Sequence, residues 1–572
     1  MKPIDFGIFQ GHTPRMTLKF SEISAERPTP DTLRATYAAI NAKLDAGDLP
    51  GAVADWETAR RAAQQYADLT HLRFSQNTQD EARKAAMDYM DELAPTITNH
   101  ETAFKQRLLA HPDRAAVQAA TGAHALTLWE TDVTTFKPEI EPDLQEEAKL
   151  QSRYTALLAS AKIMFDGKEI NLEGLGPYAQ SLDRDTRYRA AKARWDFFSE
   201  YAGEFDEIYD SLVKVRTRIA TKLGYKSFTE LGYRRMRRTD YNEADVAEYR
   251  RQVKQHVTPL VAKFFEQRRR EEGWESFHAW DAAVIDPQGN VEPAGDETFL
   301  RAQAQAMFDS MDARLADFYR LMNEDGFMDL DNRPAKAPGG FCTSFPADGM
   351  PFIFANFNGT HHDIDVFTHE MGHAFQNYAS RTQPGFDYLW PTYESAEIHS
   401  MSLEHLAYPH IALMVGEDKA ERYRRMHLIQ SVAFLPYGGC VDHFQHEIYA
   451  NPDATPAERH AMWKRLEAEY TPWVNWGDLA FAAKGGRWQA QAHIYGSPFY
   501  YIDYTLAECC ALQFWVKSRE DYAKALRDYV ALCGLGGSKP FLGLVQSAGL
   551  TSPFSPGVLE GAVKAAEAVL GL

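Results

Sequence analysis

The sequence predicts a mainly α-helical protein that contains one small β-sheet. Amphipathic patterns rich in Ala, Leu, Glu, Lys and Arg recur from about residue 30 to 160, and further helical patterns follow at 183–272. Two short runs rich in aromatic residues lie at 338–345 and 351–357, just ahead of another helical pattern. Helical patterns thus dominate the chain, and the strand-like runs suffice only for a small sheet.

We expect the chain to divide into an amino-terminal helical region at 1–160 and a second region at 161–572 that carries the chemical motifs. The length of 572 residues exceeds the usual size of a single hydrophobic core. Residues 80–93 and 101–110 are typical of the first region, because each forms an amphipathic helical pattern.

The second region contains the strands that the sequence predicts. A β-hairpin is expected at 162–172, because Asp166-Gly167 between two strand-like runs suits a tight primed turn. The runs at 338–345 and 351–357 predict two strands of a small sheet directly before a helix. An edge of that sheet is expected either to bind a peptide by strand addition or to be purely structural.

Residues 369–373, His-Glu-Met-Gly-His, carry the strongest chemical signal in the chain. Residues four apart share one helix face, so His369 and His373 can present two imidazole nitrogens to one ion. Glu370 lies between them, close enough to hold a water molecule on that ion without being a ligand. This is the H-E-x-x-H pattern of zinc peptidases, in which the metal lowers the pKa of water and the glutamate is the general base.

The surrounding residues predict that this motif lies in a buried helix. Either Asp363 or Asp365 is expected to cap its first turn. Gly372 weakens a helix interior, which makes sense if another backbone or a metal site approaches closely. An apolar stripe recurs at spacings of three and four residues: Ile364, Phe367, Met371 and Phe375.

A catalytic zinc site needs a third protein ligand and an open position. Glu394, Glu397 and Glu404 are candidates on the next predicted helix. Glu397 and Glu404 are seven residues apart and share one helix face, so one can bind the metal while the other orients a ligand imidazole. Spacing does not choose between Glu394 and Glu397.

At this point the chain resembles the thimet-oligopeptidase-like zinc peptidases of family M3, within the oligoendopeptidase F and Pz-peptidase branch. The resemblance covers roughly residues 160–515. Four segments carry it: Asn358-Gly359-Thr360, HEMGHAFQ at 369–376, Glu397-Ile398-His399-Ser400 with Glu404 seven residues on, and 493–504.

The resemblance implies one Zn²⁺ per chain, held by His369, His373 and Glu397, with Glu370 as general base. It selects Glu397 because the family's third ligand is followed seven residues later by a second Glu. It also implies a zincin-like fold with a deep substrate channel between helical lobes, which restricts substrates to short unstructured peptides. The expected activity is that of an oligoendopeptidase.

The segment 493–504 supplies hydrogen-bond donors for an oxyanion, which are often the largest catalytic contribution. In the family, the His of this segment and its last Tyr point into the cleft, which here means His493 and Tyr504. Tyr500 lies four residues before Tyr504 on the same helix face and is a further candidate. Tyr501 is expected to lie in the core.

Composition excludes several classes of partner. The net charge of −19 argues against nucleic acid, because phosphate binding needs clustered Lys and Arg. No apolar stretch approaches the length of a membrane span, and residues 1–5 lack the apolar run of a signal peptide. Five scattered cysteines fit a reducing compartment. We expect a cytoplasmic protein that acts on short peptides; no oligomeric state is predicted.

Two other functions are considered. A dipeptidyl carboxypeptidase of the same fold would trim peptides from the carboxyl terminus. A non-catalytic peptide-binding protein would retain the metal as a structural element, with a fourth ligand from His361, His362 or His399. Glu370 speaks against the second alternative, because a structural zinc needs no base.

Overall fold

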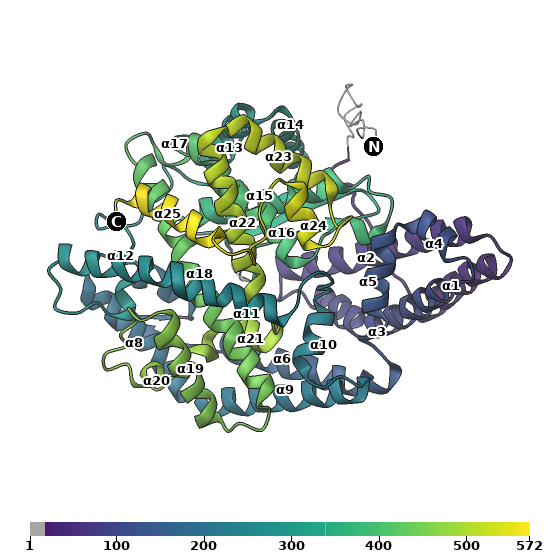
Figure 1. Cartoon of the computed structure of the whole chain (residues 1–572), viewed down its shortest axis with the longest axis horizontal. Coiled ribbons are helices and arrows are strands. Elements are labelled where there is room, and N and C mark those ends of the chain that lie inside the picture. The colour runs from purple at the N-terminus through teal and green to yellow at the C-terminus, as the bar shows by residue number, and fades with distance from the viewer. Residues whose placement is uncertain (1–17, 334, 338) are drawn as a thin grey trace.

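The computed structural model describes residues 18–333, 335–337 and 339–572. The segment 1–5, used above to predict the location of the protein, lies outside the described residues, as does Pro338, the first residue of a predicted strand run. Helices make up most of the described chain, and two small sheets accompany them (Figure 1). The predicted mainly helical fold with a small sheet is confirmed.

The amino-terminal helices form a lobe with its own core, seen as the purple and blue group at the right of Figure 1. Trp56, Phe104 and Trp129 are fully buried at its centre. The two amphipathic patterns at 80–93 and 101–110 form one continuous helix that passes through Pro95. The helices of this lobe are α1 (Pro30–Asp45), α2 (Leu49–Gln76), α3 (Glu81–Leu109), α4 (Arg114–Thr121) and α5 (Ala123–Asp132).

The predicted hairpin is present, with β1 (Ile163–Phe165) antiparallel to β2 (Lys168–Ile170). Asp166 and Gly167 both have positive φ, 45° and 78°, as a primed turn requires. Helix α8 (Arg184–Glu200) contacts β1. The larger core is built by α8 together with α6 (Glu141–Ala159), α9 (Ala202–Leu223), α10 (Phe228–Arg235), α11 (Glu243–Gln252), α12 (Thr258–Glu271), α18 (Ala420–Ala450) and α19 (Pro456–Tyr470).

The second sheet has three strands in the order β3-β5-β4. The two predicted strands are β4 (Phe341–Phe345) and β5 (Met350–Phe357), which pair antiparallel. The third strand, β3 (Met328–Asp331), pairs parallel to β5 and was not predicted. Two aspartates in four residues hide it, because Asp is unfavourable in strands. Arg333 and Lys336 neutralise Asp329 there, at 2.6 and 2.8 Å.

Three helices pack together beside this sheet: α15 (His362–Ser380), α16 (Tyr393–Leu406) and α22 (Tyr501–Glu520). Helix α15 lies against β4 and β5, and α16 lies between α15 and α22. A Cβ atom on Gly372 would lie 2.5 Å from the His399 carbonyl oxygen and 2.6 Å from Ser400 Cα. The predicted close approach of another backbone at Gly372 is therefore confirmed, and it brings α16 onto the motif helix.

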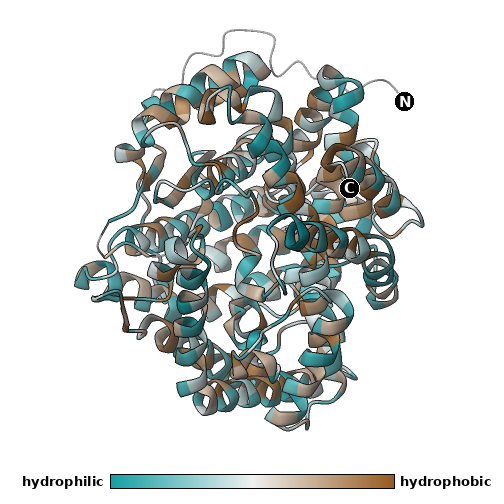
Figure 2. Cartoon of the chain, turned by 90° about the vertical axis from the view of Figure 1, so that its left-hand side faces the viewer, coloured by the Kyte–Doolittle hydropathy of each residue, from teal (hydrophilic) through white to brown (hydrophobic). Residues whose placement is uncertain are grey.

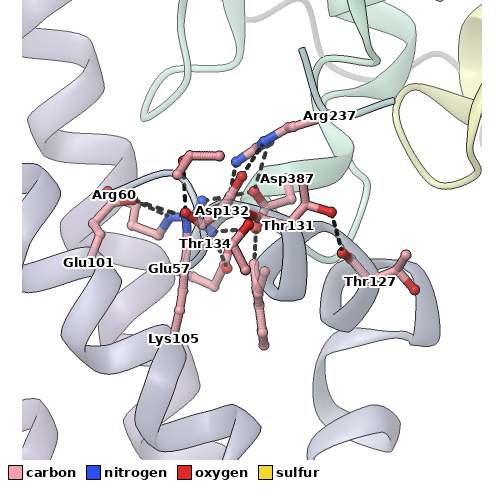
Figure 3. Close-up of polar contacts among 12 residues, drawn as sticks. Glu57, Arg60, Glu101, Lys105, Thr127, Thr131, Asp132, Thr134, Arg237 and Asp387 are labelled. Atoms are coloured by element: carbon pink, nitrogen blue, oxygen red, sulfur yellow. Dashed lines mark hydrogen bonds and ion pairs between the residues drawn. The ribbon is translucent and has the colours of Figure 1, made fainter. Parts of the chain in front are cut away.

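A buried ionic cluster joins the amino-terminal lobe to the segment just before α16 (Figure 3). Arg60 of α2 binds both carboxylate oxygens of Asp387, at 2.7 and 2.9 Å, and Trp129 Nε1 donates to Asp387 at 2.9 Å. Arg237 contacts Asp387 at 3.4 Å and also pairs with Asp132 of α5. The cluster thus anchors the connection between α15 and α16 to the lobe.

Apolar and polar residues alternate along individual helices, as Figure 2 shows by the mixture of brown and teal within single ribbons. Such helices bury one face and solvate the other. Within the part of the chain that the structure describes, no helix combines the length and apolar character that crossing a bilayer requires.

Candidate metal centre

The three predicted metal ligands meet at one point. Glu397 Oε2 lies 3.2 Å from His369 Nε2 and 3.3 Å from His373 Nε2. One ligand atom from each residue can be chosen so that all three lie within 4.8 Å of one another. His369 and His373 come from successive turns of α15, and Glu397 comes from the first turns of α16, which crosses α15 at Gly372.

These residues fit a divalent cation of the zinc type. Two imidazole nitrogens and one carboxylate oxygen are typical of catalytic zinc, and three protein ligands leave a position open. Glu397 is buried, and although burial opposes its ionisation, His373 and His369 hold its pKa well below the usual range. An ionised carboxylate facing two imidazoles in a buried setting is the electrostatic environment that a cation would complete.

An outer layer of hydrogen bonds orients His369. Its Nδ1 lies 2.7 Å from Glu404 Oε1, and the other Glu404 oxygen lies 2.7 Å from His427 Nε2. His427 Nδ1 in turn lies 2.7 Å from the Tyr408 hydroxyl. Metal-bound imidazoles are usually oriented by a carboxylate in this way. Glu404 therefore lies where the sequence predicts, whereas His427 was missed because nothing in the spacing along α18 singles it out.

Glu370 lies beside this centre with a free acceptor. Its side chain is buried, and Oε2 has no hydrogen-bond partner among the described residues. Burial raises the pKa of Glu370. A Cβ atom on Gly340 would lie 3.7 Å from Glu370 Oε1, so the backbone that enters the edge strand β4 passes close to this carboxylate. The predicted sheet edge therefore borders the candidate site.

The aromatic segment 493–504 also reaches this centre. Tyr500 donates from its hydroxyl to Glu397 Oε1 at 2.8 Å. His493 Nε2 lies 3.5 Å from the Tyr504 hydroxyl, and the Tyr500 and Tyr504 rings are 4.8 Å apart. Tyr501 instead packs against aromatic rings of α18, as expected of a core residue. The structure thus brings His493, Tyr500 and Tyr504 together with the three ligand candidates.

The backbone before α22 explains how these side chains are presented. His493 lies in the short helix α21 (Ala492–Gly496), and the chain then turns through Ser497 and Pro498 to Phe499, whose φ is 68°. Phe499 is fully buried, and its backbone N–H donates to Gln445 Oε1 at 2.9 Å. The buried phenylalanine holds this unusual backbone and starts α22 so that Tyr500 faces Glu397.

Asp363 and Glu394 neither cap the motif helix nor join the candidate ligands among the described residues. The prediction that Asp363 or Asp365 caps α15 is wrong: the capping position is His361, and no side chain bonds there. Asp363 instead accepts from the backbone N–H groups of Asn358 and Gly359, because the preceding turn folds back onto it. Glu394, the alternative third ligand, is not part of the ligand group found among the described residues. Burial, helped by the nearby Asp503 carboxylate, raises its pKa to about 8.

The additional histidines considered as a fourth ligand do not join the described metal cluster. The group of possible ligands within the described residues consists of His369, His373 and Glu397. His399 is fully buried on α16, and burial lowers its pKa to about 4. His361 lies against Asp365 and Gln430 instead. A cavity of about 310 Å³ is lined in part by Tyr393 and Tyr500, and none of the three ligand candidates lines it.

Comparison with known proteins places this centre in a family. The family model described as peptidase family M3 matches residues 178–563, and the peptidase M3 N-terminal domain matches residues 20–136. The chain belongs to peptidase family M3. The predicted family is confirmed, and the metal-ligand candidates of this M3 peptidase lie within the matched region. No match was found among the curated proteins compared.

Solved structures similar to this M3 peptidase cover almost the whole chain. A structure of Pz peptidase A with an inhibitor has 43% identity and a TM-score of 0.93, covering 97% of this chain and 99% of that one. A structure provisionally described as oligoendopeptidase F has 45% identity and the same TM-score and coverage. Another with that provisional description, from Bacillus anthracis, has 39% identity and a TM-score of 0.88, covering 97% and 98%.

Proposed function

We propose that this M3 peptidase is a zinc-dependent endopeptidase that hydrolyses internal bonds of short peptides. The observation that supports this most is the convergence of two imidazole nitrogens and the Glu397 carboxylate beside Glu370, whose Oε2 has no partner among the described residues. The similar solved structures include Pz peptidase A with an inhibitor and provisional oligoendopeptidases, which favours peptides as substrates.

His369, His373 and Glu397 would hold one Zn²⁺ per chain. Zinc supplies a Lewis acid that polarises a carbonyl group and makes water more acidic. Glu404 positions His369 through a hydrogen bond to Nδ1, and so sets which ring nitrogen faces the centre. Tyr500 donates to the second oxygen of Glu397, which leaves Oε2 directed at the imidazole pair.

Glu370 is the proposed general base. Burial raises its pKa, which makes its carboxylate a better proton acceptor than an exposed Glu. It takes a proton from the attacking water and then delivers it to the leaving nitrogen of the cleaved bond. No covalent bond between enzyme and substrate forms in this scheme.

His493 and Tyr504 are the proposed donors to the oxyanion of the tetrahedral intermediate. Burial lowers the pKa of His493 and raises that of Tyr504, so both are neutral hydrogen-bond donors near pH 7. Donors held in place before reaction stabilise developing charge without reorganisation. Tyr500 stays with Glu397 in this scheme and contributes through the ligand rather than through the oxyanion.

We also propose that the enzyme is cytoplasmic, because its cysteines form no disulfides. All five cysteines are free, and four of them are buried, so no disulfide contributes to this fold. The expected substrate channel between helical lobes and the restriction to short peptides remain part of the proposal.

The test uses a short quenched-fluorescence peptide with both termini blocked, together with metal analysis. The proposal predicts about one zinc per chain, cleavage of the blocked peptide, loss of activity with a chelator and recovery on adding zinc. A second peptide has the same sequence but a free carboxyl terminus, and a dipeptidyl carboxypeptidase would cleave only this second peptide. A zinc-loaded protein that binds both peptides and cleaves neither would instead support the non-catalytic alternative.

A further inference from the structure

A chain of hydrogen bonds leads away from His493 on the side opposite to Tyr504. His493 Nδ1 lies 2.8 Å from Gln491 Nε2, and Gln491 Oε1 accepts from the Tyr437 hydroxyl at 2.9 Å. Tyr437 lies on α18, whereas Gln491 is the residue just before α21. The proposed function assigns no role to either residue.

Tyr437 is held firmly enough to orient the amide. The Arg487 guanidinium lies 4.3 Å from the centre of its ring, and Tyr501 packs against the ring edge at 5.8 Å. Arg487 is fixed in turn by Glu467 at 3.0 Å. The Tyr437 hydroxyl donates to Gln491 Oε1, and in this arrangement the amide N–H₂ group faces His493 Nδ1.

The amide determines where the imidazole carries its hydrogen. An amide nitrogen only donates, so the ring nitrogen that faces it must accept, and Nδ1 therefore carries no hydrogen. In a neutral ring the hydrogen is then on Nε2, the nitrogen that faces Tyr504. Tyr504 can accept from Nε2–H, which leaves its own hydroxyl hydrogen free for an oxyanion.

The other groups that face His493 do not offer Nδ1 a competing carboxylate. The rings of Tyr500, just before α22, and of Tyr501 and Tyr504, on α22, surround it at 5.0 to 5.8 Å. Glu397 of α16 favours the charged ring electrostatically, but burial outweighs it and lowers the pKa of His493. Tyr437 of α18 reaches the ring only through Gln491.

We propose that Gln491, oriented by Tyr437, is a positioning residue that holds His493 as the tautomer with hydrogen on Nε2. Tyr504 then never has to donate to the ring, so its hydroxyl hydrogen stays free for the oxyanion. The Nε2–H faces the Tyr504 oxygen in the free enzyme and turns to the oxyanion when substrate is bound. The inference rests on the proposed function of His493 as an oxyanion donor. It deepens that proposal by naming the two residues that make the donor available.

The deciding variant is Gln491→Glu, which keeps the shape but replaces a donor with a carboxylate acceptor. The carboxylate draws hydrogen onto Nδ1, so the neutral ring loses Nε2–H and accepts from Tyr504 instead. We expect kcat at pH 7.5 to fall about a hundredfold with KM little changed. The same carboxylate raises the pKa of His493, so the doubly protonated ring restores Nε2–H at acidic pH and the optimum moves to lower pH.

Two further variants separate this role from a merely structural one. Gln491→Met removes the donor without supplying an acceptor, and we expect a loss of about tenfold in kcat with no new acidic optimum. Tyr437→Phe leaves the amide free to turn over and should cost a few-fold in kcat. Gln145→Glu on the exposed face of α6 adds the same charge and should leave the profile unchanged.

The outcomes distinguish this inference from the proposed function. If His493→Ala retains nearly full kcat, the donor role itself fails. If His493→Ala is strongly impaired while Gln491→Glu has the wild-type pH profile, only the positioning role of Gln491 fails. Should Gln491→Glu not fold, wild-type kcat in Gln491→Met would overturn the inference in its place.

Discussion

Two buried carboxylates, Asp387 and Glu397, lie on either side of the start of α16 and are neutralised in different ways. Both oxygens of Asp387 accept hydrogen bonds from fixed cations or an indole, chiefly Arg60 at 2.7 and 2.9 Å (Figure 3). Glu397 faces two imidazoles and a tyrosine hydroxyl, none of which carries a permanent charge.

The difference separates a structural cluster from a candidate reactive one. Arg60 keeps its charge at all accessible pH values, so the Asp387 cluster is complete without any ligand. The pKa of Asp387 is accordingly well below its usual range: burial opposes ionisation, but Arg60 and Arg237 outweigh it. Glu397 faces two imidazoles, which bind a metal only in their neutral form, so the lasting positive charge at this centre would come from a cation outside the chain.

The largest expected effect is on catalysis at the candidate metal centre, which needs a cation from outside the chain. Glu370→Gln should lower kcat about a thousandfold while zinc content and thermal stability stay close to wild type, because Glu370 is not a ligand. Zinc content by metal analysis and kcat on a blocked peptide check this. The exposed variant Glu417→Gln is a matched control. Substantial residual turnover would remove Glu370 from the role of base.

A change in the Asp387 cluster should lower the stability of the fold and leave metal binding unchanged. Asp387→Asn leaves Arg60 and Arg237 buried without their carboxylate, which should lower the free energy of unfolding by about 3 kcal/mol. Denaturant unfolding measures the loss, and metal analysis of the folded fraction should still find zinc. Asp31→Asn, which breaks an exposed pair with Arg34, should change stability little. An equally small effect at Asp387 would contradict the comparison.

Loss of the Tyr504 hydroxyl beside the metal centre should affect the transition state more than substrate binding. Tyr504→Phe is expected to lower kcat about a hundredfold with KM nearly unchanged, because its hydroxyl is needed only when the oxyanion forms. Tyr501→Phe removes a hydroxyl from the same helix, α22, but from a ring that packs against α18, and should have little effect. A change confined to KM would argue for a role in substrate binding instead.

The smallest expected effect concerns Glu404, which orients His369 from outside the metal centre. Glu404→Gln keeps a hydrogen-bond acceptor for His369 but removes its charge, and zinc affinity should fall roughly tenfold. Competition with a chelator of known affinity measures this. Unchanged affinity would show that His369 is oriented by packing alone and that Glu404 contributes nothing to metal binding.

Local patterns alone predicted much of the molecule. The motif helix, the hairpin at Asp166-Gly167 and the two strands of the small sheet follow from periodicity and turn chemistry, which act between residues close in sequence. The close approach at Gly372 was also foreseeable, because glycine destabilises a helix interior and is expected there only where another group must come close. The family resemblance selected Glu397 over Glu394, and the structure places these two acids in different surroundings.

Contacts between distant segments decided the rest. The structure alone shows that His427 reaches Glu404, that Arg60 reaches Asp387 across 327 positions, and that Tyr437 reaches Gln491. Each partner is an ordinary residue in its own helix, with no local signal of its role. The sequence by itself determined which helices form and which of them carries the motif. The packing of α15, α16 and α22 determined which polar groups meet, because burial makes an unpaired polar group costly and so favours those pairings.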